Sequence, residues 1–205
     1  MKKTVALLPL LAVLPLSANT WEAGLFIGQQ SYKSHTVSTL SVEADSKVAY
    51  GFRLGRSIVD LGPALITITA GFQPETKTTL KYSGAIAPAY QVGNVTASAP
   101  SVDYKTQHFS VGAMANFKAF VAVGAGIEYR FEKLEIEGTS TNYARPWVRV
   151  NAGIAIPSPV VKPFIGVEAA IPVTSKSLEL SSSDEDFLKA MAPKFQIGVY
   201  AGIRF

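Results

Sequence analysis

The sequence contains no cysteine and only two histidines, His35 and His108, among its 205 residues. The absence of cysteine excludes a disulfide scaffold, a zinc ribbon and any thiol nucleophile. Two histidines leave little material for a histidine-based metal site, so we expect neither a metal nor a cofactor. Charged residues make up only 17% of the chain, and the net charge of +4 is too small to indicate a nucleic-acid-binding surface.

Long hydrophobic runs are also missing, although 48% of the residues are hydrophobic. After the first 18 residues, no stretch has the ~18 consecutive apolar residues that a membrane-spanning helix needs. The composition nevertheless offers few charged residues to cover an ordinary soluble surface. The apolar residues must therefore follow a pattern other than a continuous run.

The first 18 residues have the three parts of a secretory signal peptide. Lys2 and Lys3 form a positive start, residues 4–16 are almost wholly apolar, and Ala18 is a small residue suited to cleavage. A membrane anchor is the alternative, but the run is short for a span and contains two prolines. We expect export, cleavage after Ala18, and no lipid anchor, because no cysteine follows.

The rest of the chain alternates apolar residues with small or polar ones, the periodicity of a β-strand between two different environments. Residues 121–131 and 195–205 show this alternation most clearly. Six further segments follow the same pattern, at residues 21–28, 47–55, 64–72, 108–115, 148–154 and 165–171. The pattern therefore predicts eight strands.

The connections between these strands alternate in length. Short breaks follow the second, fourth and sixth strands, and the first of these breaks holds Gly62 and Pro63. Long stretches follow the first, third, fifth and seventh strands, at residues 31–46, 74–103, 134–143 and 174–193. For residues 19–205 this order predicts an all-β fold, an eight-stranded antiparallel up-and-down β-barrel with four long loops at one end.

Two kinds of barrel share this plan, and they differ in the face that turns inward. A soluble lipocalin-like barrel places bulky apolar residues inside and charged residues outside. Here the second face of the strands is rich in glycine and alanine, with few charges. That face is a poor solvent surface but suits a narrow lumen, whereas the uncharged apolar face suits lipid. We therefore predict a transmembrane barrel.

Aromatic residues near the predicted strand ends support this interpretation, because membrane barrels carry aromatic girdles at both interfaces. The alternative is that they are core aromatics of a soluble sandwich. We expect lipid–water interface positions for Trp21, Phe72, Phe131, Trp147 and Phe195.

The last strand, residues 196–205 (QIGVYAGIRF), ends on an aromatic residue and resembles the C-terminal sorting signal of bacterial outer-membrane proteins. With residues 123–131 (VGAGIEYRF), it makes the chain similar to the small outer-membrane β-barrel superfamily, the OmpA/OmpX-type eight-stranded barrels. The resemblance covers nearly the whole mature chain. It implies a porin-like barrel in a Gram-negative outer membrane and contact with the barrel-assembly machinery, through an assembly signal formed by Val199, Ile203 and Phe205.

The inward face carries four residues of each charge, which we expect to pair because unpaired charges in a narrow lumen are costly. They are Glu22, Glu128, Glu132, Glu168, Arg53, Arg130, Arg149 and Arg204. Glu22 begins the first strand and Arg204 ends the last, so we predict a contact across the closure of the barrel. Glu128, Arg149 and Glu168 come from consecutive strands and are predicted to form a second cluster, joined by Arg53 or Arg130.

One candidate catalytic pair is present, His108 and Ser110, at the His-x-Ser spacing seen in outer-membrane lipid A deacylases. Phe109 belongs to the lipid face, so the alternation turns both residues into the lumen, away from membrane lipid. We therefore assign no catalytic residue and expect no enzyme activity. A run of acids at residues 184–186 lacks the EF-hand spacing and is interpreted as a solvated loop.

The functional hypothesis is a monomeric outer-membrane scaffold that displays its loops for surface interaction, adhesion or envelope integrity. Its expected partners are outer-membrane lipid, lipopolysaccharide phosphates near Lys77 and Lys81, and a host or surface ligand held by the loops. A narrow pore for small solutes is the first alternative, and a membrane-lipid-modifying enzyme is the second.

Overall fold

The computed structural model describes residues 20–37, 40–83, 101–118, 120–156, 158, 160–178 and 183–205. The predicted signal peptide lies outside these residues. Ten strands and one helix are found in the described part of the chain. In order they are β1 (Trp21–Ser31), β2 (His35–Val37), β3 (Leu40–Ala44), β4 (Lys47–Asp60), β5 (Ala64–Ser83), β6 (Ser101–Phe117), β7 (Ala122–Ile136), β8 (Thr139–Ala155), β9 (Lys162–Pro172), α1 (Asp184–Ala190) and β10 (Phe195–Arg204).

Eight of these strands form a closed antiparallel ring, so the predicted eight-stranded up-and-down barrel is confirmed. The hydrogen-bonded order runs β5-β4-β1-β10-β9-β8-β7-β6, and a pairing of β5 with β6 closes it. The first and last strands are neighbours, since β1 pairs with β10 along its whole length. Closure leaves no open edge around the ring, which satisfies the backbone polar groups without water.

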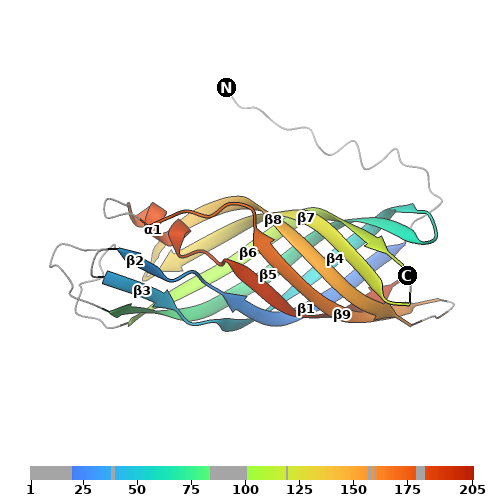
Figure 1. Cartoon of the computed structure of the whole chain (residues 1–205), viewed down its shortest axis with the longest axis horizontal. Helices are drawn as coiled ribbons and strands as arrows, with labels where there is room; N and C mark the ends of the chain where they lie inside the picture. The colour runs from blue at the N-terminus through green and yellow to red at the C-terminus, as the bar shows by residue number, and fades with distance from the viewer. Residues whose placement is uncertain are drawn as a thin grey trace, which may run out of the picture.

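The barrel is elongated and its two ends differ (Figure 1). At one end, here called the loop end, lie α1, β2 and β3, with β3 paired to the outer part of β5. The chain terminus that follows β10 lies at the other end, here called the turn end, where the short connections are. The wall at the loop end is tall on one side because β5, β6, β7 and β8 are the longest strands.

All four of the predicted long loops contain regular structure in the residues that the structure describes. Residues 134–143 were expected to be a loop, but they are strand, and β7 and β8 meet in a tight hairpin at Glu137 and Gly138. Both residues have positive φ angles, 44° and 86°, as a two-residue hairpin turn with matching twist requires. Residues 31–46 contain β2 and β3, and residues 174–193 contain α1. The outer stretch of residues 74–103 extends β5 and β6, and residues 84–100 lie outside the described part.

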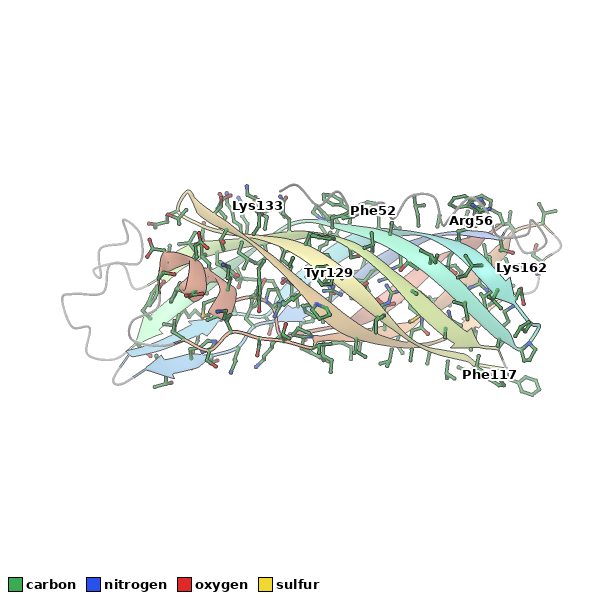
Figure 2. All side chains as sticks on the ribbon, turned by 90° about the horizontal axis from the view of Figure 1, so that it is seen from above. Phe52, Arg56, Phe117, Tyr129, Lys133 and Lys162 are labelled. Carbon is green, nitrogen blue, oxygen red and sulfur yellow. The ribbon has the colours of Figure 1, made fainter. Side chains whose placement is uncertain are left out.

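The outward face of the ring is apolar and uncovered. Leu25, Phe52, Ile127 and Val167 are each more than half exposed, although they sit in the middle of long strands. Figure 2 shows Phe52 and Tyr129 projecting away from the wall. The described part of the chain has no helix long and apolar enough to span a membrane.

The inward-facing residues are glycines where two strands come close together. Gly28 on β1 pairs with Gly198 on β10, and a Cβ added to Gly198 would overlap the Cα of Gly28. The glycines on this face therefore allow a few long polar side chains to fill the lumen of an eight-stranded barrel, whose interior is only wide enough for side chains.

Candidate functional site

The lumen is the site where the chain gathers its buried charges. All eight residues predicted from the alternation point into it, from β1, β4, β7, β8, β9 and β10. Glu128, Arg130, Glu132, Arg149 and Glu168 are buried, each at most 4% exposed. Five long charged side chains can be buried in one place only if they are paired and hydrogen-bonded.

Five of these residues form one connected group, here called the central ion cluster: Arg53, Glu128, Arg130, Arg149 and Glu168. Arg53 donates through both terminal nitrogens to Glu168, at 2.8 and 2.7 Å. Glu128 accepts from the Nε of Arg130 and from the Nη1 of Arg149, the latter at 3.1 Å. Arg149 Nε lies 3.7 Å from Glu168 Oε2, which links the two halves of the cluster.

Glu22 and Arg204 meet across the seam of the ring. They are register partners on β1 and β10, and Arg204 Nη2 donates to Glu22 Oε2 at 2.7 Å. Both side chains are 17% exposed. The guanidinium carbon of Arg204 also lies over the ring of Phe164, 5.6 Å from the ring centroid. This pair forms a second ionic contact nearer the turn end.

The remaining predicted charge, Glu132, is paired with a residue that the sequence reasoning did not select. Arg145 on β8 is 1% exposed and donates to Glu132 through Nε at 2.7 Å and Nη2 at 3.2 Å. It also donates to the carbonyls of Thr174 and Pro193, which precede and follow α1. Arg145 therefore ties the connection that contains α1 to the barrel wall. Its spacing of four residues from the inward Arg149, which is two periods of a β-strand, was the signal that could have placed it in the lumen.

The prediction for Trp147 is wrong: it is not an interface aromatic. Its side chain is fully buried in the lumen, with the guanidinium carbon of Arg130 3.9 Å and that of Arg145 5.0 Å from the ring centroid. Neighbouring Val148 is the residue that faces outward. Both guanidinium groups lie over the indole ring, whose π-electrons stabilise the positive charges. Of the other predicted interface aromatics, Trp21, Phe72 and Phe131 are nearly half exposed on the outer face, and Phe195 is partly exposed.

Between the ion cluster and the loop end lies a layer of three buried glutamines. Gln73 donates to Gln30 at 2.8 Å, and Gln196 donates to Gln73 at 2.7 Å. Gln30 also donates to the hydroxyls of Tyr32 and Thr106, at 2.7 and 2.9 Å. This layer crosses the lumen from β5 to β1 and β10 with its amides hydrogen-bonded to each other.

The loop end of the lumen is closed by a cluster that is apolar, here called the apolar plug. It consists of Tyr32, Val42, Leu80, Val102, Tyr104, Leu134, Ile136, Phe187, Leu188, Met191 and Ala192. The inward positions therefore change from polar to apolar where the strands leave the exposed apolar band. The sequence reasoning missed this change because it followed the inward face only within the predicted spans.

Helix α1 covers the plug and has clear start signals. Ser183 is its N-cap and accepts a hydrogen bond from the backbone of Asp186. The acids of residues 184–186 form the first turn, where the helix dipole favours them, so they are neither a calcium loop nor an irregular loop. His35 donates from Nε2 to the Ala190 carbonyl at 3.0 Å, which joins β2 to the end of the helix.

Burial governs the titration of the groups around the plug. It raises the pKa of Tyr104 well above its ordinary value, and it raises the pKa of Tyr82 to about 12. Burial also lowers the pKa of His35, against the opposing effect of its bond to Ala190. These side chains are therefore neutral at neutral pH, as a packed apolar region requires.

His108 and Ser110 lie on the inward face of β6. Both line a cavity that also contains Glu128 and Arg130, and Ser110 is 5% exposed. Phe109 between them is 47% exposed on the outer face. The pair therefore does not face the exterior of the barrel. In the described part of the chain, no group of three or more His, Asp or Glu side chains is arranged to hold a metal ion.

Comparison with known proteins identifies the fold. No protein-family model and no curated protein matches the sequence. The crystal structure of Neisserial surface protein A (NspA) matches with a TM-score of 0.50 and 12% identity, covering 90% of this chain and 95% of that chain. Ail of Yersinia pestis matches with a TM-score of 0.38 and 14% identity, covering 91% and 99%. Its complex with the heparin analogue sucrose octasulfate gives 0.40 and 13% over the same shares.

The ring of strands and the likeness to NspA define the class of fold. The chain folds as an eight-stranded antiparallel β-barrel, and it shares this fold with NspA. At 12% identity this likeness concerns the fold and carries no function with it.

Proposed function

We propose that this protein is an integral outer-membrane barrel that acts as a scaffold and holds its loop end outside the cell. The observation that carries the proposal is the contrast between the two faces of the ring. The outer face is a band of exposed apolar residues, while the lumen is filled by ion pairs, glutamines and the apolar plug. A barrel built in this way suits lipid on its outside and offers structure, rather than a wide channel, on its inside.

The loop end is the candidate interaction surface. It contains the hairpin at Glu137 and Gly138, helix α1 and the β2–β3 hairpin, all anchored on a packed core. Rigid elements that carry exposed loops are the usual place for recognition. NspA is named a surface protein, and this chain shares its fold. We propose that a monomer without catalytic residues uses this end for adhesion, for another surface interaction or for envelope integrity.

Lipid is the second proposed partner. Lys105 and Lys133 lie on β6 and β7, one or two outward positions beyond the exposed Phe109 and Phe131. Cations at this height lie where the phosphates of lipopolysaccharide are found. Insertion into the membrane would require the barrel-assembly machinery, reached after export by the signal peptide.

The native chain lacks cysteine, so single cysteines can test the proposed orientation. Ser140→Cys at the loop end and Leu61→Cys at the turn end both place a thiol at an exposed position. With a membrane-impermeant maleimide on intact cells, we expect Ser140→Cys to react at once and Leu61→Cys to react only after the outer membrane is permeabilised. Equal labelling of both positions would refute the orientation, and recovery in the soluble periplasmic fraction would refute the membrane location.

A narrow pore is the second candidate function, favoured by two cavities in the lumen. One is lined by His108 and Arg130, and the other by Arg149 and Arg204 at the turn end. The central ion cluster and the apolar plug lie across the path that would join them to the loop end. A conducting state would therefore require both to rearrange.

A further inference from the structure

The central ion cluster has unequal numbers of positive and negative groups. It contains three guanidinium groups, on Arg53, Arg130 and Arg149, but only two carboxylates, on Glu128 and Glu168. Among the described residues, the other buried charges near it are already matched in pairs, Arg145 with Glu132 and Arg204 with Glu22. The lumen therefore holds one excess positive charge. Leaving such a charge buried without a counter-charge is strongly unfavourable.

A cavity lies beside this cluster on the side of the turn end. Its volume is about 40 Å³, and its lining includes Arg149, Thr67, Asn151 and Arg204. A void of about 10–15 Å³ already accommodates one water. This one has space for a small ion, alone or with a water, and excludes larger organic anions.

Two buried groups at this cavity make no hydrogen bond, although Arg149 Nε also lies 3.7 Å from Glu168 Oε2. Arg149 Nε and Thr67 Oγ1 are buried without a hydrogen bond, in side chains that are 2% and 1% exposed. Arg204 Nε and the amide oxygen of Asn151 are also unpartnered there. The amide can flip, which would turn its NH₂ toward the cavity. A buried donor without an acceptor is energetically unfavourable, so these groups point to an acceptor that fills the space.

We propose that this cavity binds a small monovalent inorganic anion of the size of chloride. The anion accepts hydrogen bonds from Arg149 Nε and the Thr67 hydroxyl, and it supplies the negative charge that the central ion cluster lacks. The Glu22–Arg204 pair and Lys118 line the same cavity toward the turn end. Glu22 is neutralised by its own pair, so it does not cancel the attraction of Arg149.

Bromide tests the position of the anion because it replaces chloride and scatters anomalously. In crystals of the full folded barrel soaked in bromide, we expect one anomalous peak within hydrogen-bond distance of Arg149 Nε. A cavity that contains only water under these conditions would overturn the proposal.

Chloride-dependent stability tests the same site in solution. At constant ionic strength, with gluconate as the replacement anion, the urea midpoint of the native chain should rise and saturate with chloride. Asn151→Asp places a fixed carboxylate in the cavity and should remove this dependence. Thr67→Val should raise the chloride concentration at which the urea midpoint saturates. The matched control Thr141→Val, at the loop end of β8, should leave this concentration unchanged. A chloride response that is absent in the native chain, or unchanged in Asn151→Asp, would contradict the proposal.

Discussion

Trp21 and Phe205 exchange two backbone hydrogen bonds where the ring closes. Trp21 donates to the Phe205 carbonyl at 2.7 Å, and Phe205 donates to the Trp21 carbonyl at 2.9 Å. The side chain of Phe205 is left 56% exposed on the outer face. The backbone of Phe205 thus completes the seam, while its ring is free to contact lipid or an assembly factor.

This arrangement separates assembly from stability in the variant Phe205→Ala. The variant keeps both backbone bonds, so the folded barrel should be nearly as stable as the native one. Assembly in cells should fall several-fold if Val199, Ile203 and Phe205 form the signal. Phe117→Ala is the matched control, because Phe117 is equally exposed at 56% on β6. The measurement is the folded, heat-modifiable fraction on a cold gel, and equal losses in both variants would disprove a special role for Phe205.

The central ion cluster predicts a strong effect for Glu128→Gln. This change leaves three guanidinium groups with one carboxylate, and breaking a buried pair in this way costs about 3–5 kcal/mol. Adding Arg149→Met removes one of the excess charges, so the double variant should be more stable than the sum of the single effects predicts. Urea unfolding of the native chain, the two single variants and the double variant in detergent micelles measures this coupling. Additive effects would show that the cluster does not act as a unit.

The close approach of β1 and β10 predicts a steric effect at Gly198. A methyl group there overlaps the backbone of Gly28, and neither backbone is free to move in a closed ring. Gly198→Ala should therefore lower the free energy of unfolding by about 1–3 kcal/mol. In the control Gly51→Ala, the nearest atom to the added Cβ is the Phe72 carbonyl oxygen at 3.2 Å. A smaller loss is expected there, and an equal urea midpoint for the two variants would contradict the packing argument.

His35 predicts a loosening of α1 at acidic pH. Its pKa in the folded chain lies below its ordinary value of about 6.5, because burial disfavours the charged ring. The unfolded or opened state therefore binds more protons, and the packed state loses stability as pH falls through about 6.5 toward the lower folded pKa. Hydrogen exchange of α1, corrected for intrinsic rates, should speed up on acidification. His35→Gln keeps an N–H donor but cannot titrate, so an unchanged pH response in this variant would rule out His35 as the cause.

Most of the ring could be predicted from the sequence because an apolar outer face and a small or polar inner face impose a strict two-residue period. The same period turned Glu22, Glu128 and Arg204 to one side, and chain order made β1 and β10 neighbours. The period also placed Trp147 inward, next to the outward Val148. The error came from giving the position of an aromatic near a strand end more weight than the phase of its own strand.

The loop end could be predicted less well, because its inward residues obey another rule. Beyond the exposed apolar band of the ring, inward positions such as Leu80, Tyr104 and Leu134 are no longer polar but pack as an ordinary apolar core. Arg145 lies between the polar part of the lumen and the apolar plug. It pairs with the Glu132 carboxylate and donates to the Thr174 carbonyl, from segments distant in sequence. Helix α1 had local signals in Ser183, in the acids after it and in the helical spacing of Phe187, Leu188 and Met191. A short run of charges is nevertheless also typical of a loop, and this feature was given more weight.

Single-channel recording in planar lipid bilayers tests the central claim of a membrane barrel with a filled lumen. The central ion cluster, the glutamine layer and the apolar plug predict insertion without stable conductance steps, at either polarity. Frequent, stable steps of large conductance from the purified, folded barrel would contradict this account and favour the pore.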